Sequence, residues 1–375
     1  MGFSAPGVIA GLHDLVDELR RRGLTVVAPT LRDSAIVLAE IESADELPHG
    51  WGVDVAPGTY RVRRRADRAA FGHSAGPQSW KQFLHPPRQR VWSSDGDAED
   101  PRPRYAFLGV RGCDLAAIGV LDRVLIGGAH VDDSYARRRG AFIIAVNCTE
   151  PGGLCFCASM NTGPACGPGY DLVLTERALT ERVDGDDVHY LIDAGTEEGA
   201  DVLGAITHRR AQPAECDAAD ADIAAAATRM GRAMPDTDLR NLLIDARESP
   251  HWQDVASRCL TCGNCTMVCP TCFCTSTSDV TDLTGEHAER WMDWASCFEF
   301  DFTFVHEGPV RTSGPSRYRH WLTHKLSSWH DQFGSSGCVG CGRCIAWCPT
   351  GIDITEEMGV FAAEAAQAAE AEDRA

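Results

Sequence analysis

The chain has 375 residues, of which 44% are hydrophobic and 24% charged, so it is long enough for two or three domains and is neither disordered nor fibrous. Its formal net charge of −19 disfavours binding to nucleic acid or to an anionic membrane surface. No apolar run approaches the ~20 residues of a membrane span, and no signal peptide precedes the 17 cysteines. We therefore expect a cytoplasmic protein whose cysteines are reduced thiols, available as metal ligands rather than joined in disulfides.

The N-terminal segment predicts a helix followed by strands. Apolar residues recur at helical spacing over residues 7–22, and two strand-like runs follow. The segment 45–103 is rich in Gly, Pro and charge, and its last part, residues 93–103, is expected to be an exposed, mobile loop. Regular structure is expected to resume at Tyr105.

The middle of the chain has the pattern of an α/β unit with parallel strands. Buried strands are expected over residues 105–110 and 141–146, with an amphipathic helix over 114–124 between them. Cys113 and Cys148 lie just past the ends of these strands, where sites form in such sheets. Two further strands, over 172–174 and 189–193, are expected to be joined by a turn at Asp184, Gly185 and Asp186.

From about residue 218 the pattern becomes helical. The expected helices cover residues 221–234, 237–247, 252–258 and 356–374, and the last of these is rich in Ala and Glu, with an acidic face that is expected to be solvated.

Two cysteine runs carry the strongest signal. The pattern C-x2-C-x2-C-x3-C-P occurs twice, ending at Pro270 and at Pro349. Three thiolates of such a run hold one [4Fe-4S] cluster, and the fourth ligates the neighbouring cluster. The first predicted cluster is therefore held by Cys259, Cys262, Cys265 and Cys348, and the second by Cys338, Cys341, Cys344 and Cys269. Gly263, Gly340 and Gly342 suit the tight loops that surround a cluster.

Two other uses of these cysteines are weaker alternatives. A zinc ribbon takes two C-x-x-C pairs and leaves the third and fourth cysteines of each run unexplained. A redox dithiol needs only two thiols.

Nine cysteines lie outside the runs. Cys113, Cys148, Cys155 and Cys157 follow strands and supply the four thiolates of a candidate third [4Fe-4S] cluster, with a set of buried, inert thiols as the alternative. Cys272, Cys274 and Cys297 either shield or hydrogen-bond a cluster, or join a site whose fourth ligand is not identified. Cys166 and Cys216 look incidental.

The 68 residues between Cys269 and Cys338 exceed the link of a compact bacterial ferredoxin, and we expect helices to fill them. The tryptophans of this insert are expected to pack around the clusters, and its basic residues either tune cluster potentials, dock a partner or form a solvated face. His320 and His324 are expected to pack rather than bind metal. The tryptophans are Trp291, Trp294, Trp321 and Trp329, and the basic residues are Arg311, Arg317, Arg319 and Lys325. Only two of the chain's 35 basic residues are lysines, Lys81 and Lys325, and we give this bias toward arginine no functional weight.

These patterns predict an α/β N-terminal domain with a parallel or mixed sheet, followed by a mainly helical, ferredoxin-like domain with two [4Fe-4S] clusters. The expected divisions are an α/β domain at 1–215, a helical linker at 216–250, the two-cluster domain at 251–355 and an acidic C-terminal helix at 356–375.

Several ordered motifs also resemble a known family. They are RGCDLAAI, NCTEPGGLCFC, GYDLVLTE, HWQDVASRCLTCGNCTMVCPTCFC, RWMDWASC and SSGCVGCGRCIAWCPTGID. Together they resemble the iron-sulfur β subunit of soluble sulfhydrogenases, the cytoplasmic NAD(P)-linked [NiFe] hydrogenases. They are also similar to the electron-transfer subunit of anaerobic sulfite reductases.

The resemblance implies a protein that is not catalytic by itself and carries electrons within an oxidoreductase complex. Its implied partners are a diaphorase subunit that binds flavin and NAD(P), together with the small and large subunits of a [NiFe] hydrogenase, or else a sirohaem subunit of sulfite reductase. No G-x-G-x-x-G fingerprint follows a strand, so neither NAD nor flavin is expected in this chain. A flavin-binding β subunit is the second alternative, and a zinc-stapled interaction module the third.

Overall fold

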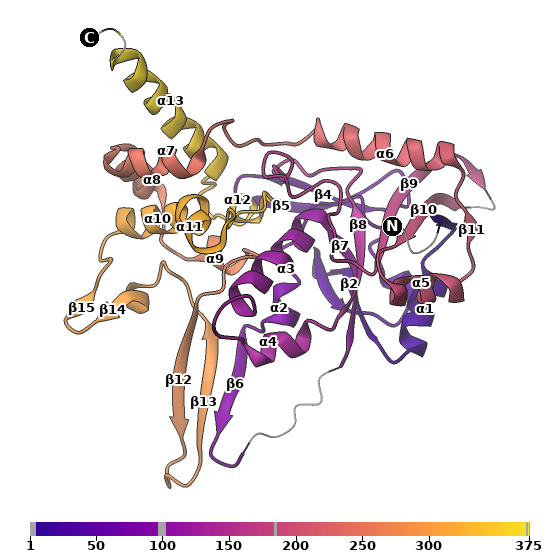
Figure 1. The fold of residues 1–375 in the computed structure, drawn as a ribbon, viewed down its shortest axis with the longest axis horizontal. Coiled ribbons are helices and arrows are strands. Elements are labelled where there is room, and N and C mark those ends of the chain that lie inside the picture. The colour runs from indigo at the N-terminus through magenta and orange to yellow at the C-terminus, as the bar shows by residue number, and fades with distance from the viewer. Residues whose placement is uncertain (1–4, 97–102, 184–185, 373, 375) are drawn as a thin grey trace.

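The computed structural model describes residues 5–96, 103–183, 186–372 and 374. Figure 1 shows a large sheet with helices on both faces, followed by helices, loops and small sheets that contain the cysteine runs. The elements up to residue 210 are β1 (Gly7–Ile9), α1 (His13–Arg21), β2 (Thr25–Arg32), β3 (Ala35–Glu40), the 3-10 helix η1 (Ala44–Glu46), β4 (Trp51–Ala56), β5 (Thr59–Arg64), α2 (Lys81–Leu84), β6 (Arg88–Ser93), β7 (Tyr105–Arg111), α3 (Gly112–Leu125), α4 (Asp133–Arg138), β8 (Phe142–Asn147), β9 (Leu172–Val183), β10 (Asp186–Ala194), α5 (Glu197–Ala205) and β11 (Arg209–Arg210).

The remaining elements are mainly short. They are α6 (Pro213–Ala227), α7 (Leu239–Asp245), η2 (Ala246–Glu248), α8 (His251–Arg258), α9 (Asn264–Met267), β12 (Thr275–Thr281), β13 (Ala288–Trp294), η3 (Phe300–Thr303), β14 (Phe304–Val305), β15 (Gly308–Pro309), α10 (Gly314–Thr323), the π-helix η4 (His324–Ser328), α11 (Trp329–Phe333), α12 (Arg343–Ala346) and α13 (Ile354–Glu372).

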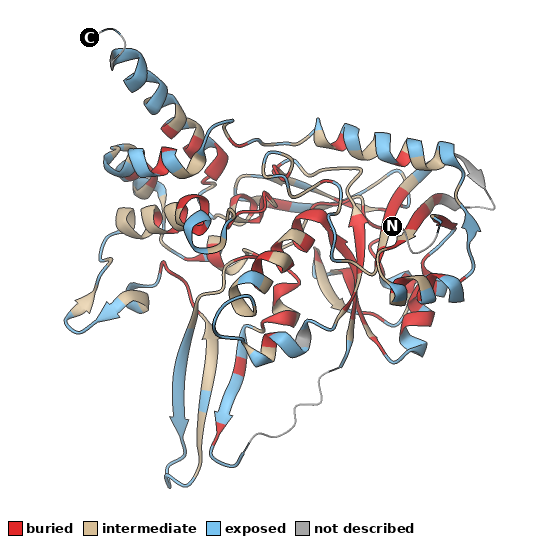
Figure 2. Ribbon diagram, viewed as in Figure 1, coloured by how far each residue is buried: buried red, intermediate tan, exposed pale blue. Residues whose placement is uncertain are grey.

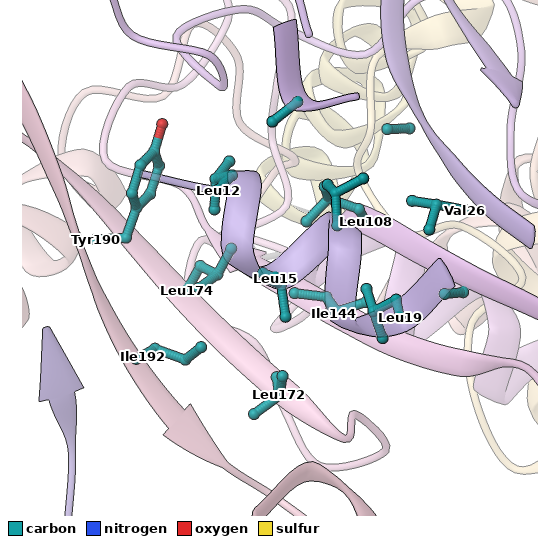
Figure 3. Packing of buried hydrophobic residues seen from close by; sticks show 14 of the residues in the cluster. Leu12, Leu15, Leu19, Val26, Leu108, Ile144, Leu172, Leu174, Tyr190 and Ile192 are labelled. Carbon is teal, nitrogen blue, oxygen red and sulfur yellow. The ribbon is translucent and has the colours of Figure 1, made fainter. Parts of the chain in front are cut away.

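The described residues form one large mixed sheet with the strand order β11-β1-β10-β9-β8-β7-β2-β3. Its centre, from β9 through β8 and β7 to β2, is parallel, and the outer pairs are antiparallel. Helix α1 packs Leu15 and Leu19 against Leu108 and Ile144 on one face, as Figure 3 shows. Helix α3 packs Leu115 and other apolar residues against the opposite face. The central strands are therefore buried on both sides, as parallel strands usually are.

The predicted α/β unit is confirmed, with differences at the N-terminal side. Strands β7 and β8 and helix α3 lie where the sequence predicts them. The predicted helix over residues 7–22 is shorter, because Gly7–Ile9 pairs with β10 as a strand and the helix begins at His13. The segment 45–103, expected to lack regular structure, contains the β4–β5 hairpin and β6. Residues 97–102 of the predicted loop and residues 184–185 of the predicted turn lie outside the described residues.

The prediction that helices fill the insert between the cysteine runs holds only for its later part, where α10, η4 and α11 cover residues 314–333. Strands β12 and β13 form a hairpin, and β6 from the first half of the chain adds to it as a third strand. Figure 1 shows this three-stranded arm projecting from the body, and Figure 2 shows that β12 is exposed along its length. β-Branched residues such as Thr277 and Val280 favour a strand, and pairing with β6 completes a small sheet that the local sequence alone does not reveal. The mainly helical character predicted for the two-cluster domain is therefore not confirmed, since its insert contains both strands and helices.

The C-terminal helix has a buried and an exposed half. Met358 and Phe361 of α13 are fully buried, whereas residues 365–371 are exposed (Figure 2). Its acidic face is solvated only in part, because Glu357 is 3% exposed and accepts hydrogen bonds from Arg258. Within the described residues, no helix combines the length and apolar character needed to cross a membrane.

Candidate metal centres

A first thiol cavity lies where α8, α9 and the loop after α12 meet. It is lined by five cysteines, Cys259, Cys262, Cys265, Cys344 and Cys348. Four of these are the ligands predicted for the first cluster. About 430 Å³ of space not filled by atoms, part of it open to solvent, lies within this lining, and apolar residues such as Phe298, Tyr318 and Trp321 form much of the remaining wall. Cys262 is exposed, so this cavity lies close to the surface of the chain.

A second thiol cavity lies directly beside the first. It is lined by Cys265, Cys269, Cys338, Cys341 and Cys344 and encloses about 320 Å³. This set contains the four ligands predicted for the second cluster. Cys265, Cys344 and Trp321 line both cavities, so the two are neighbours. In each cavity the structure brings three cysteines of one run together with the fourth cysteine of the other run.

The loops that present these thiols depend on glycine. Gly263 and Gly342 have φ values of +76° and +74° and immediately precede the short helices α9 and α12. Gly340, at φ +65°, lies so close to the chain at Cys157 that a Cβ atom would be 2.6 Å from the Cα of Cys157. A side chain there would push two cysteine-bearing segments apart.

The cavity thiols differ in their exposure to water: Cys338 is buried, Cys262 is exposed and the other six are intermediate. Burial raises the pKa of Cys338 to about 12 and raises the pKa values of Cys265 and Cys344 well above that of an exposed thiol. Without metal these thiols stay protonated, and metal binding releases their protons. Cys269 differs from these three thiols: its hydrogen bond with Cys272, and then the charge of Lys325, lower its pKa despite burial.

This donor set fits polynuclear clusters. No group of three or more Cys, His, Asp or Glu side chains in the described part of the chain is gathered as a site for a single metal ion. The thiols instead surround two apolar cavities, an arrangement that can hold a cluster from several sides.

Both lysines of the chain lie beside the second thiol cavity. Lys325 Nζ donates to Cys269 Sγ at 3.3 Å, and Lys81 Nζ donates to the carbonyl oxygen of Cys272 at 2.9 Å. Their side chains are almost completely buried. Burial would lower the pKa of Lys325, but the negative charge of Cys269 and Cys272 outweighs it and raises that pKa. The sequence pointed to Lys325 only as one of four basic residues in the insert that could tune cluster potentials, and it gave no role to Lys81.

A third thiol group lies at the carboxyl ends of β7 and β8. This group consists of Cys113, Cys148, Cys155 and Cys157. Burial, followed by Cys155, Cys148 and Cys341, raises the pKa of Cys157 to about 12, and burial together with Cys148 also raises the pKa values of Cys113 and Cys155. Cys341 belongs to the second thiol cavity, so the third thiol group adjoins that cavity. Phe156 N also donates to the carbonyl oxygen of Gly340 at 2.9 Å.

A buried arginine, missed in the sequence, belongs to the third thiol group. Arg111 Nη1 donates to Cys148 Sγ at 3.1 Å, and Nη2 donates to the carbonyl oxygens of Phe71 and His73. Its place directly before Gly112 and Cys113, at the end of a buried strand, was the available signal. Cys166 also lies near Cys148, where burial and then Cys148 raise its pKa, so it is less incidental than expected.

The other predicted positions have ordinary surroundings. Cys272, Cys274 and Cys297 surround the two lysines, with Cys272 hydrogen-bonded to Cys269. Their role as cluster shields stays a prediction. His320 and His324 stack with ring centroids 5.7 Å apart, and His324 Nε2 lies 3.1 Å from Gln332 Oε1.

The predicted basic patch is not one surface. Lys325 points inward, whereas Arg311 and Arg319 line a shallow groove with both histidines. Of the four tryptophans, Trp321 lines both thiol cavities, Trp329 is buried against Phe273 and Phe333, and Trp291 and Trp294 lie on the projecting arm. Trp294 contacts Lys81, whose Nζ lies 3.6 Å from its ring centroid, so packing around the clusters stays a prediction for Trp291 and Trp294.

Fold and thiols together define an iron-sulfur protein, and the comparisons agree. Residues 258–352, which hold both cysteine runs, match the family described as a 4Fe-4S dicluster domain. The chain is also 30% identical over 275 residues to the β subunit of sulfhydrogenase 2 from Pyrococcus furiosus, an alignment that covers 71% of this chain and 75% of the relative.

The chain belongs to the family of sulfhydrogenase β subunits. It is an iron-sulfur electron-transfer subunit that binds [4Fe-4S] clusters.

Proposed function

We propose that this chain relays single electrons within a cytoplasmic multisubunit [NiFe] hydrogenase, between a flavin subunit that binds NAD(P) and the hydrogenase small subunit. The observation that carries the proposal is the continuity of the thiol sites. The first thiol cavity lies near the surface at Cys262 and shares two cysteines with the second, which adjoins the third thiol group through Cys341. Three adjacent thiol sites are the arrangement expected for electron transfer from cluster to cluster, rather than for separate metal sites with a structural role.

The proposed ligand sets follow the cavity linings. Cys259, Cys262, Cys265 and Cys348 hold one [4Fe-4S] cluster, and Cys338, Cys341, Cys344 and Cys269 hold another. Cys113, Cys148, Cys155 and Cys157 hold a third, and Arg111 compensates part of its negative charge. When bound, the clusters supply reversible one-electron chemistry. The protein's side chains exclude water, fix the thiols and donate hydrogen bonds to sulfur.

Cofactor analysis of the complex isolated from its native host tests the choice of partner. The hydrogenase assignment predicts nickel together with flavin and several irons per complex. A complex that contains sirohaem and no nickel would instead establish the sulfite reductase alternative. Stoichiometric flavin in the separated chain itself would contradict the assignment of flavin to a partner subunit.

A further inference from the structure

The two lysines of this chain are buried at one site. Only Lys81 and Lys325 occur among 35 basic residues, and they are 3% and 5% exposed. Arginine supplies the positive charge of exposed ion pairs such as Arg290 with Asp279 and Arg63 with Asp54. A lysine carries a compact ammonium that can enter a narrow space, whereas a guanidinium is broad and planar.

Lys325 is held directly against the second thiol cavity. Its Nζ lies 3.3 Å from Cys269 Sγ, 3.0 Å from Thr271 Oγ1 and 3.2 Å from the carbonyl oxygen of Gly337. These three acceptors satisfy the three N–H donors of the ammonium, which therefore needs no hydrogen bond to water. The residue lies in the π-helical segment η4, an irregularity that is often found at functional sites.

Among the described residues, the first thiol cavity has no buried lysine equivalent to Lys325. Within the described residues, its cysteine sulfurs are contacted by Thr261 N, by Ile352 N and by the hydroxyl of Thr350, at 3.3 to 3.4 Å, and by no lysine or arginine hydrogen bond. The two cavities therefore differ by one buried cationic donor.

We propose that Lys325 raises the reduction potential of the cluster site in the second thiol cavity selectively, by donating a hydrogen bond from its ammonium to Cys269 Sγ. Hydrogen bonds to the sulfurs and nearby charge are established determinants of cluster potential, because they stabilise the extra negative charge of the reduced state. This inference rests on the proposed function, since it requires a [4Fe-4S] cluster in each cavity.

Redox titration of the full-length, anaerobically reconstituted chain, followed by electron paramagnetic resonance, tests the proposal. In Lys325→Met one couple should move to lower potential, with the equilibrium constant for its one-electron reduction falling at least tenfold, or about 59 mV. The remaining couples should not move. Unchanged potentials, or an equal shift of every couple, would overturn the role of Lys325.

Lys81→Met is the matched control. It removes the other buried ammonium, whose Nζ contacts a carbonyl oxygen and the ring of Trp294 and, among the described residues, makes no hydrogen bond to sulfur. Lys81→Met should change the reduction potential less than Lys325→Met does. An equal or larger change would contradict a specific hydrogen bond from Lys325 to Cys269.

A second measurement uses the unaltered sequence and does not depend on the folding of a variant. Lysine labelled with ¹⁵N at Nζ enters at only two positions, and electron-nuclear double resonance of the reduced wild-type chain should show ¹⁵N coupling to one cluster signal. Lys81→Met should retain this coupling. A wild-type chain with cluster signals but no coupling would refute the bond and leave the proposed function intact, whereas a chain without cluster signals would refute both.

Discussion

At the scale of single residues, a buried ion pair joins two cysteine-bearing segments. Asp114 follows Cys113, and Arg343 lies between Cys341 and Cys344 in the sequence. The side chains of Asp114 and Arg343 are 5% and 3% exposed. Arg343 Nη2 donates to Asp114 Oδ2 at 3.1 Å. Arg343 Nη1 lies 2.8 Å from Asp114 Oδ1, but these two atoms are not aligned for a hydrogen bond. Asp114→Ala leaves the guanidinium without its counter-charge, so we expect the free energy of unfolding to fall by about 3–5 kcal/mol.

Anaerobic urea unfolding of the reconstituted chain measures this loss. Asp279→Ala is the control, because its pair with Arg290 is exposed on both sides and should contribute no more than about 1 kcal/mol. Similar losses in the two variants would show that burial of the Asp114 pair has no special importance.

His73 makes stability depend on pH. Burial, and then the neighbouring Arg111, lower the pKa of His73 to about 3, and its Nε2 has no hydrogen-bond partner among the described residues. Between about pH 6.5 and 3 the unfolded chain binds a proton here that the folded chain does not, so stability falls as the pH drops through this window. Because of His73, the free energy of unfolding should fall by about 1.4 kcal/mol when the pH is lowered from 7.5 to 5.5.

Comparison with His73→Gln isolates this contribution. Unfolding is measured at both pH values, and the wild type should lose about 1.4 kcal/mol more than the variant. Parallel losses would show that the imidazole is already protonated, or accessible, in the folded chain.

The sequence predicts the cysteines better than their electrostatic surroundings. The spacing of each run is local, so the eight thiols that line the two cavities could be identified without a structure. The contacts made by Lys325, by Arg111 and within the Asp114–Arg343 pair could not, because the partners lie 56, 37 and 229 residues apart along the chain. Such contacts are products of tertiary packing.

At the scale of elements, α13 divides into a structural and a dispensable half. The ring of Phe361 lies 4.4 Å from that of Trp252, centroid to centroid, and is fully buried. Phe361→Ala should lower the free energy of unfolding by about 3–5 kcal/mol. Deletion of residues 366–375 should cost less than about 1 kcal/mol, since residues 366–371 are exposed.

The same urea experiment on both variants checks this division. A deletion as harmful as Phe361→Ala would mean that the exposed half of α13 makes contacts that the isolated chain does not show.

Element prediction succeeded where periodicity was local. The buried strands β7 and β8 and the helix between them follow from apolar runs and helical spacing. The arm of β12 and β13 did not, because it is stabilised by β6, whose residues come almost 200 positions earlier. Hydrophobic periodicity carries no information about such a distant partner.

At the scale of the whole molecule, the third thiol group decides the length of the relay. Iron analysis of the anaerobically reconstituted chain should give about twelve atoms with a third cluster and about eight without it. We expect the double variant Cys155→Ala/Cys157→Ala to lower the count by about four. An unchanged count would show that these thiols do not hold iron.

The division of the chain at 215/216 and 250/251 stays a prediction. The large sheet and the thiol cavities are nevertheless joined by contacts that cross it, such as Phe156 with Gly340. The second thiol cavity and the third thiol group therefore lie where the two halves meet, which the order of motifs along the sequence could not reveal.

Mössbauer spectroscopy of ⁵⁷Fe-reconstituted, full-length protein tests the central claim most directly. Cages built from cysteines of both runs predict spectra dominated by cubane-type iron, with about eight or more atoms per chain. Iron without that signature, or zinc in place of iron, would contradict the account.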